Sequence, residues 1–443
     1  MKRGKKIIII FSALAFLCSL SFSNGLNLDG LGSRAISMGG AFVGLADDYS
    51  AIYWNPAGAA FFSSKVFGVS GLDILPSSTY EMSIPVPGVG PLTIVDAKTT
   101  TKHYLAGMAA YYHPVSPNIV AGIGVYTPSG LGANWDGQDF AVISGNNPAI
   151  KWQSKVGVVS FSPLIAVKLS DQIAFGATFN LNYGMFDLAM HAGEVIIPIA
   201  VLPYYMYVDL GQYEESMTGW GYGATFGFMF KPNEVFSLGA SLKTPSTIKF
   251  KGEASISNLS LIGANATSDS ERDVTWPLWI GAGIAFNPTP GLTLTADIQW
   301  TQWSTLDNIR TDYKDPFWQI MMEESGDDNR PLRWKNVAQL RFGFEYLMRE
   351  NLALRGGYCY DPTPTPDETL NVLLPSYTFN VFDIGLGYNL NGLCIDFGLE
   401  YLAGKEREVL YEKYVLDPDY ATAQPGIYNI SIFVPHFAIS YKF

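Results

Sequence analysis

Apolar and polar residues alternate at every second position through most of this chain, and this alternation limits the fold more strongly than any other sequence feature. Between residues 173 and 183, for example, Phe175, Phe179 and Leu181 fall on one face, whereas Thr178 and Asn180 fall on the other. A period of two is that of a β-strand with one apolar and one polar face. Fourteen segments alternate in this way or have strand composition, at residues 66–74, 103–113, 118–126, 156–169, 172–186, 218–231, 234–243, 276–287, 291–304, 336–347, 350–361, 379–390, 392–402 and 430–443.

The connections between these segments alternate in length. Six are short and rich in turn residues, at 114–117, 170–171, 232–233, 288–290, 349–350 and 391–392. Seven are long, at about 75–102, 127–155, 187–217, 244–275, 305–335, 362–378 and 403–429. Short turns at one end, long loops at the other and an even number of strands are typical of bacterial outer-membrane barrels. We therefore predict an all-β transmembrane fold, a 14-stranded antiparallel outer-membrane β-barrel with both termini on the periplasmic side.

The apolar faces favour a membrane barrel over the alternative, a soluble β-sandwich. They end in aromatic residues such as Trp300 and Tyr346, as expected for side chains at a membrane interface. Only 15% of the residues are charged although 48% are hydrophobic, whereas soluble domains have about 25% charged residues. The longest apolar run, at 195–208, is interrupted by Pro198 and Pro203, so we expect no membrane-spanning helix.

Both ends of the chain carry export signals. Lys2 and Arg3 precede an apolar run at 7–17, and small residues follow up to Ser23, which predicts a removed signal peptide over residues 1–23. The last segment alternates up to Phe443, the terminal aromatic pattern that outer-membrane barrels present to the barrel-assembly machinery. The formal net charge of −12 argues against a nucleic-acid partner.

The segment at 24–64 differs from the rest of the chain because Gly and Ala dominate it and no alternation runs through it. It reads as turns and short helical pieces, which predicts an N-terminal hatch, or plug, inside a barrel formed by residues 65–443. Asn55 suits a helix N-cap and Pro56 the first helical position, with Ala57 after them. We treat Asn55, Pro56 and Ala57 as a candidate gate, and we expect the hatch to switch between occluded and open forms.

Several short motifs follow one another along this strand pattern. They are WNPAG at 54–58, TPSGLG at 127–132 followed by Trp135, KTPS at 243–246 followed by IKFKG at 248–252, and YDPTPTPD at 360–367 followed by Leu374 and Pro375. In this order the mature chain resembles the FadL/TodX family of outer-membrane transporters. The resemblance implies a barrel plugged by an N-terminal hatch, ligands that are long-chain fatty acids or hydrophobic aromatic compounds, and exit through a gap where the third strand is kinked. It would place that lateral exit at Gly122 and Gly124.

Two sets of residues are candidates for contact with such ligands. Parity places Arg341 and Arg355 on the lumen face, where an arginine fork would suit a fatty-acid carboxylate; the alternative is a salt-bridge network with inward acidic residues such as Asp297 and Glu345. Apolar residues in two loops are candidates for an external hydrophobic groove, and the alternative is that they only pack the loops together. The groove residues are Leu131, Trp135, Phe140, Ile196, Ile197, Ile199, Leu202 and Tyr204.

The sequence thus predicts passive uptake of hydrophobic compounds, with long-chain fatty acids placed first and outer-membrane lipids as the other partner. Uptake of aromatic hydrocarbons, a general aqueous porin and a purely structural barrel remain alternatives. No catalytic residue, metal site or cofactor is expected, because the chain has no Gly-x-Ser-x-Gly, His-Glu-x-x-His or phosphate-binding glycine motif. Its four histidines also lack the spacing of metal ligands.

Overall fold

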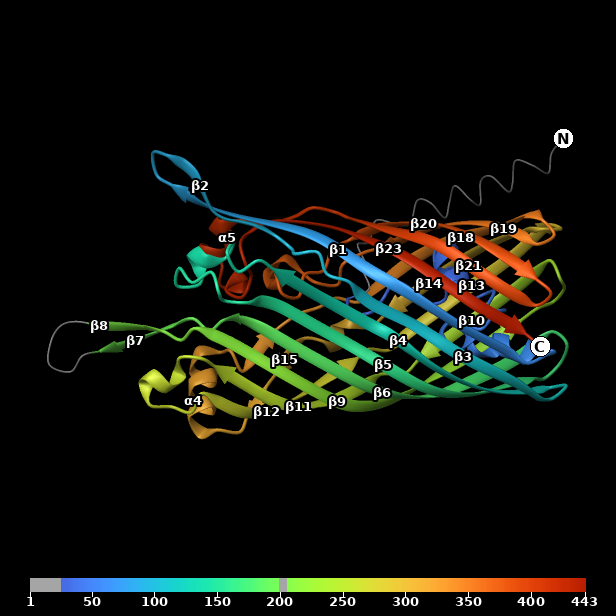
Figure 1. Ribbon diagram of the computed structural model, residues 1–443, viewed down its shortest axis with the longest axis horizontal. Coiled ribbons are helices and arrows are strands. Elements are labelled where there is room, and N and C mark those ends of the chain that lie inside the picture. The colour runs from blue at the N-terminus through green and yellow to red at the C-terminus, as the bar shows by residue number, and fades with distance from the viewer. Residues whose placement is uncertain (1–24, 199–204) are drawn as a thin grey trace.

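The structure is a computed structural model that describes residues 25–198 and 205–443, and the signal peptide predicted over residues 1–23 lies outside these ranges. In the described residues fourteen antiparallel strands pair in chain order, and the last pairs with the first to close a barrel (Figure 1). The barrel strands are β1 (Val66–Val86), β3 (Tyr104–Ser116), β4 (Ile119–Trp135), β5 (Trp152–Lys168), β6 (Ile173–His191), β9 (Gln212–Phe230), β10 (Phe236–Lys243) continued by β11 (Ser246–Ile256), β12 (Thr267–Trp276) continued by β13 (Trp279–Thr289), β14 (Leu292–Thr301), β18 (Val337–Arg349), β19 (Leu352–Asp361), β20 (Phe379–Leu390), β21 (Leu393–Gly404) and β23 (Gly426–Lys442).

The two faces of the strands are those that the alternation predicts. On β18, Gln339 and Arg341 are buried inside the barrel, whereas Phe342, Phe344 and Tyr346 are exposed on its outer surface. An outer band of apolar side chains suits the lipid, and pairing of β1 with β23 closes the sheet into a barrel. Within the described residues no helix is long and apolar enough to cross a membrane.

The six short turns lie at the end of the barrel where the C-terminus lies, and the long connections lie at the other end (Figure 1). In the turn between β20 and β21, Asn391 and Gly392 have φ values of 50° and 86°. This left-handed pair matches the twist of a two-residue hairpin, in which Asn-Gly is strongly preferred.

Several strands extend further than predicted, so the connections at 75–102 and 187–217 are partly strand. β1 continues to Val86 and pairs with β2 (Gly90–Lys98) in a hairpin that projects past the barrel end (Figure 1). A second projecting hairpin connects β6 to β9. It consists of β7 (Glu194–Pro198) and β8 (Tyr205–Asp209). Outside the lipid neither face needs to be uniformly apolar, so the alternation that marks a strand fades there.

The outer end of the barrel is closed by packed loops. Their short elements are η2 (Ala141–Ile143), η3 (Leu259–Ile262), η4 (Trp303–Thr305), β15 (Asn308–Arg310), β16 (Asp312–Tyr313), α4 (Pro316–Ser325), β17 (Asn329–Pro331), η5 (Asp367–Thr369), β22 (Arg407–Val409), α5 (Tyr411–Leu416) and η6 (Pro418–Tyr420). Tyr80, Phe140 and Tyr428 are fully buried in the apolar cluster that these loops form with the strand ends. Among the described residues this cluster fills the outer end of the barrel.

The N-terminal segment before β1, within the predicted hatch at 24–64, fills one end of the lumen with α2 (Ser33–Ser37), α3 (Ala51–Trp54) and η1 (Pro56–Phe61), and we refer to its residues 25–62 as the hatch. Its backbone lies directly against glycines on the inner wall. A Cβ atom at Gly357 would come within 1.9 Å of the Gly39 nitrogen, and one at Gly239 within 2.0 Å of the Val43 oxygen. Similar close approaches occur at Gly176, Gly283 and Gly343. The hatch therefore fits only because these wall positions have no side chain.

We predict that Gly357→Ala detaches the hatch while the barrel stays folded, because overpacking of this kind costs about 1–3 kcal/mol. Limited proteolysis should then cut residues 25–62, and planar bilayers should show a steady ion conductance that the wild type lacks. Gly157→Ala is the control, since its Cβ would lie 3.5 Å from Met185 Cε in ordinary contact. A Gly357→Ala protein as protease-resistant as this control would contradict the prediction.

Candidate functional site

The wall of the barrel is incomplete between β3 and β4. The two strands pair from Ser116 and Ile119 up to Met108 and Tyr126, and no further. At the next residue Thr127 replaces the missing pairing with its side chain, because its hydroxyl accepts from the Gly107 N–H (2.9 Å) and donates to the Gly107 carbonyl (3.2 Å). Pro128 has no N–H to donate, so a regular ladder cannot continue through it.

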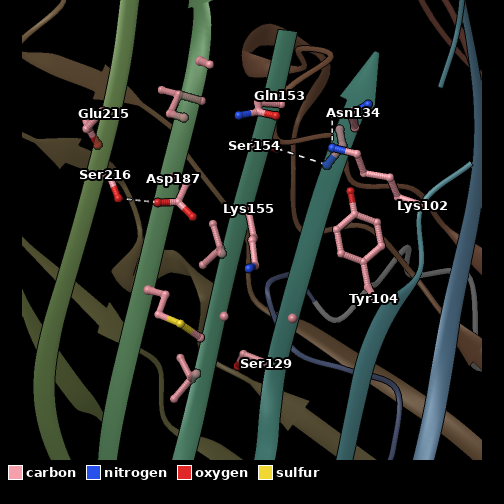
Figure 2. A pocket seen from close by; sticks show the side chains of 18 of the residues that line it. Lys102, Tyr104, Ser129, Asn134, Gln153, Ser154, Lys155, Asp187, Glu215 and Ser216 are labelled. Atoms are coloured by element: carbon pink, nitrogen blue, oxygen red, sulfur yellow. Dashed lines mark hydrogen bonds between the residues drawn. The ribbon is translucent and has the colours of Figure 1, made fainter. Parts of the chain in front are cut away.

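The opening is bounded on all sides. Beyond it the Thr100 N–H donates to the Asn134 carbonyl at 2.9 Å, and Thr99 forms a bridge with Trp135. We call this opening the window and define it by residues 104–107 of β3 and 127–134 of β4. A cavity of about 750 Å³ lies at the window and extends along β5, β6 and β9 (Figure 2).

Tyr104 crosses the window. Its ring packs on Gly132 of β4, where an added Cβ would lie 2.7 Å from Tyr104 Cε1. Figure 2 shows the ring between the end of β3 and β4, in the place where backbone pairing is absent. Tyr104 is thus the side chain that narrows the window, and only a glycine opposite leaves room for it.

The start of the hatch lies on the inner side of the window. The Leu28 N–H donates to the Pro128 carbonyl at 3.1 Å, and Ser129 Oγ donates to Asn27 Oδ1 at 3.0 Å. Trp276 Nε1 also donates to Ser129 Oγ, at 2.8 Å, so the bulged strand is held from the opposite wall as well. A shift of residues 27–29 would therefore break hydrogen bonds to Pro128 and Ser129 at the window.

Two small chambers lie between the hatch and the barrel wall near the window. One, of about 100 Å³, shares Ile74 and Gly130 with the window cavity. The other, of about 90 Å³, shares Asn27 and Asp29 with the first chamber. Each has room for a few water molecules rather than an acyl chain, and hatch residues such as Asn27 and Asp29 line both of them.

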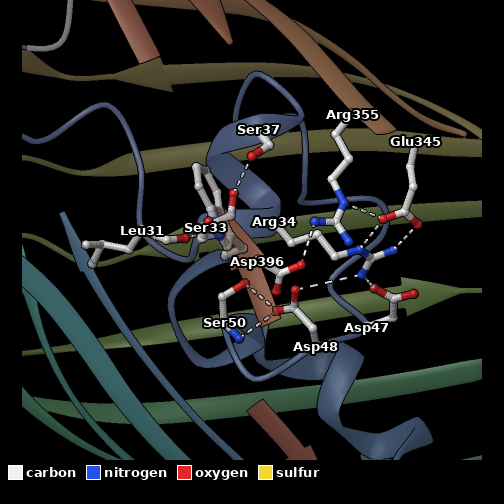
Figure 3. Close-up of polar contacts among 11 residues, drawn as sticks. Leu31, Ser33, Arg34, Ser37, Asp47, Asp48, Ser50, Glu345, Arg355 and Asp396 are labelled. Atoms are coloured by element: carbon white, nitrogen blue, oxygen red, sulfur yellow. Dashed lines mark hydrogen bonds and ion pairs between the residues drawn. The ribbon is translucent and has the colours of Figure 1, made fainter. Parts of the chain in front are cut away.

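Ion pairs tie the hatch to the wall (Figure 3). Arg34 of the hatch forms two hydrogen bonds to Glu345 of β18, at 2.8 and 2.9 Å, and also contacts Asp47 and Asp48. Glu345 accepts in turn from Arg355 Nε at 2.6 Å. Burial raises the pKa of Asp48 above its ordinary value, although Arg34 beside it acts in the opposite direction. The network joins two hatch turns to one hairpin of the barrel.

The two arginines proposed for carboxylate recognition lie in these contacts. Arg341 is fully buried, and its guanidinium holds both oxygens of Asp29 at 2.8 and 3.0 Å and the Gly39 carbonyl at 3.1 Å. Arg355 is held by Glu345 and by Asp396, which lies 2.6 Å from its Nη1. Their geometry matches the alternative interpretation, a lumen salt-bridge network.

Asn55, Pro56 and Ala57 adopt the helix-start turn that their sequence predicts. Asn55 Oδ1 accepts from the Ala57 N–H at 3.1 Å, and Pro56 opens η1. Asn55 Nδ2 also donates to the Val43 carbonyl and to the Phe228 carbonyl of β9, at 2.9 and 3.0 Å. The turn is thus fastened to the wall, and its role as a gate remains a prediction.

The structure does not bring the predicted groove residues together. Trp135 and Phe140 are buried in the loop cluster, whereas Ile196 is exposed on the projecting β7–β8 hairpin. Leu131 lies on β4 and Ile197 on β7, and Ile199, Leu202 and Tyr204 lie outside the described residues. For Trp135 and Phe140 the surroundings are those of loop packing.

Gly122 and Gly124, predicted to mark the lateral exit, lie in the paired part of β4, and their role as an exit stays a prediction. Both pair with β3 on one side and with β5 on the other. The break in strand pairing begins at Thr127. The neighbouring Pro128 is a sequence signal for such a break, because proline cannot donate a backbone hydrogen bond. The sequence has no such signal for Tyr104 and Asn27. Tyr104 packs on Gly132 and Asn27 accepts from Ser129, and both contacts join segments that are distant in the chain.

We predict strong coupling between Arg341 and Asp29, because removing one partner of a buried pair costs about 3–5 kcal/mol. Arg341→Met and Asp29→Asn should each release the hatch at lower urea concentration, measured by proteolysis of residues 25–62. The double variant should lose at least about 1 kcal/mol less than the sum of the two single losses. Additive losses would show that the pair does not hold the hatch.

Metal chemistry has no support here: across residues 25–198 and 205–443 no group of His, Cys, Asp and Glu is placed to hold a metal ion.

Comparisons with known proteins place the chain. Residues 14–426 match the family model described as outer membrane protein transport protein (OMPP1/FadL/TodX). Outer membrane protein P1 of Haemophilus influenzae is 21% identical over 83% of this chain and 84% of its own length, and the 47 kDa outer membrane protein of Pasteurella multocida is 22% identical over 96% and 97%.

Solved structures share the fold. A FadL homologue of Pseudomonas aeruginosa has a TM-score of 0.76 at 16% identity, covering 95% of this chain and all of that one. The toluene transporter TodX of P. putida has a TM-score of 0.69 at 16% identity, over 94% of this chain and 99% of its own. The chain is therefore an outer-membrane transport protein, not an enzyme, and it belongs to the OMPP1/FadL/TodX family.

Proposed function

We propose that this transporter carries long-chain fatty acids from outside the cell into the lipid of the outer membrane and releases them sideways through the window. The observation that carries the proposal is the break between β3 and β4 in a barrel whose periplasmic end is filled by a tied hatch. A side exit suits an apolar ligand, because entry into water forfeits about 0.8 kcal/mol per methylene.

The outer wall beside the window supports release into lipid. A shallow hollow of about 890 Å³ shares Leu105 and Ala106 with the window cavity. Phe397, Leu399 and Phe437 line it, and Leu105 is exposed at its edge. An acyl chain that leaves the window would meet an apolar surface at once.

Two alternatives remain. Neutral aromatic hydrocarbons are favoured by the similar solved structures, one of which is a toluene transporter. A general aqueous porin is disfavoured, because the hatch and the loop cluster occupy both ends of the lumen.

Uptake of labelled oleate and of toluene, measured side by side in cells that lack their own transporter and express this protein, tests the proposal. Oleate uptake above the empty-vector level supports it, and toluene uptake alone would shift the substrate to aromatic hydrocarbons. Large steady currents of the purified protein in planar bilayers would instead indicate a porin.

We predict that Tyr104→Ala raises the initial uptake rate several-fold, since it removes the ring that fills the window. Tyr111→Ala, on the same strand but paired with β4 at Ile123, should leave the rate unchanged. A Tyr104→Ala rate equal to that of the wild type would mean that the exit lies elsewhere.

A further inference from the structure

Four carboxyl groups meet around a guanidinium where the hatch faces β19, β20 and β21. Asp29 of the hatch, Asp361 of β19 and Glu400 of β21 line the chamber of about 100 Å³ described above. Asp383 of β20 lies directly opposite Glu400 in the strand pairing, and only 7% and 4% of these two residues are exposed. Arg341 of β18 is the cation among them. Four ionised carboxylates and one guanidinium would give this buried cluster a net charge of −3.

The guanidinium of Arg341 is already engaged by one of these carboxylates. It donates to both oxygens of Asp29, at 2.8 and 3.0 Å, and its remaining hydrogen bonds go to two hatch carbonyls and to the side chain of Gln339. Within the described residues neither oxygen of Asp383 has a hydrogen-bond partner, and Glu400 Oε1 has none either. Two deeply buried carboxyl groups are therefore left without a cation to neutralise them.

Glu400 and Asp29 are hydrogen-bonded to each other through their side chains. Two carboxyl groups can share a hydrogen bond only when one of them carries a proton, because an ionised carboxylate is an acceptor alone. Since the guanidinium pairs with Asp29, the proton belongs to Glu400, which donates to Asp29. The position of Asp383 opposite Glu400 acts in the same direction, because like charges on directly paired residues are destabilising.

We propose that Glu400 and Asp383 form a proton-binding site that locks the hatch, so that the hatch stays docked while these two carboxyl groups hold their protons. When a base in the solvent takes the proton from Glu400, the O–H bond breaks and a second negative charge faces Asp29 across the contact between hatch and wall. Repulsion between the two carboxylates in this buried place then drives the hatch from the wall. The inference goes beyond the proposed function, because it holds for any transported compound.

The sign of the pH dependence follows from the number of protons bound in each state. The docked hatch buries Glu400 and Asp383 and keeps their protons, whereas in the released state both groups meet water and ionise as ordinary carboxyl groups do. The docked state thus binds more protons, so docking weakens as the pH rises.

Other titratable groups packed around this site have to be separated from it in the test. Apart from Asp29 and Arg341, they are Asp361, which accepts from Gln339 Nε2 at 2.7 Å, the thiol of Cys359, the phenol of Tyr53 and the imidazole of His436. A thiol becomes negative as the pH rises, in the same direction as a carboxyl group. Cys359 lies opposite Arg341 on the neighbouring strand, so Cys359→Ser is the matched control.

The test follows release of the hatch from the full protein in lipid nanodiscs between about pH 6 and pH 9, a range in which phenols stay neutral. Release is measured as the rate of proteolysis within residues 25–62, divided by the cleavage rate of an unfolded substrate at the same pH. Heat-modifiable migration on gels reports whether the barrel is folded. The wild-type rate should rise by roughly tenfold or more, since one linked proton changes an equilibrium by up to about tenfold per pH unit.

The double variant Glu400→Gln, Asp383→Asn should keep the hatch docked across this range. An amide is neutral at every pH, and the glutamine side chain can still donate to Asp29. Cys359→Ser should show the wild-type rise. Where the double variant does not form a folded barrel, Glu400→Gln alone is compared with the wild type and should show a smaller rise.

Three results would overturn the proposal. The first is a wild-type release rate that does not change with pH. The second is a wild-type rise in the folded Glu400→Gln, Asp383→Asn protein, or a loss of the rise in Cys359→Ser, which would assign it to the thiol. The third is a folded double variant that releases its hatch at every pH, because the hatch would then need ionised carboxylates rather than protonated ones.

Discussion

Every backbone N–H and C=O that faces lipid needs a partner within the protein, and the barrel is the answer to that requirement. At the window the hydrogen-bonded pairing of β3 with β4 stops, but three of the backbone groups there have other partners. The Thr127 hydroxyl bonds to both the N–H and the carbonyl of Gly107 on β3. The N–H of Leu28, in the hatch, donates to the carbonyl of Pro128 on β4. Side-chain and hatch groups thus take the place of strand pairing for these three backbone groups at the break.

Contacts other than strand pairing also hold the hatch against the barrel wall. Glycines on the inner wall let the hatch backbone approach closely, and buried ion pairs from Arg34 and Arg341 fix its register. Buried pairs give little net stability but penalise any misplaced partner strongly. Several buried contacts therefore hold the hatch in one position against the wall.

The sequence by itself determined the barrel, its fourteen strands, the turns such as Asn391-Gly392 and the local turn at Asn55, because alternation and turn chemistry are properties of neighbouring residues. It also showed that Arg341 and Arg355 face inward. Only the tertiary structure decided that these arginines contact the hatch, that Phe140 is buried in loop packing, and that the pairing of β3 with β4 stops at Thr127. Each of these depends on what lies across the lumen or on the next strand, and parity along one strand gives the direction of a side chain but not its partner.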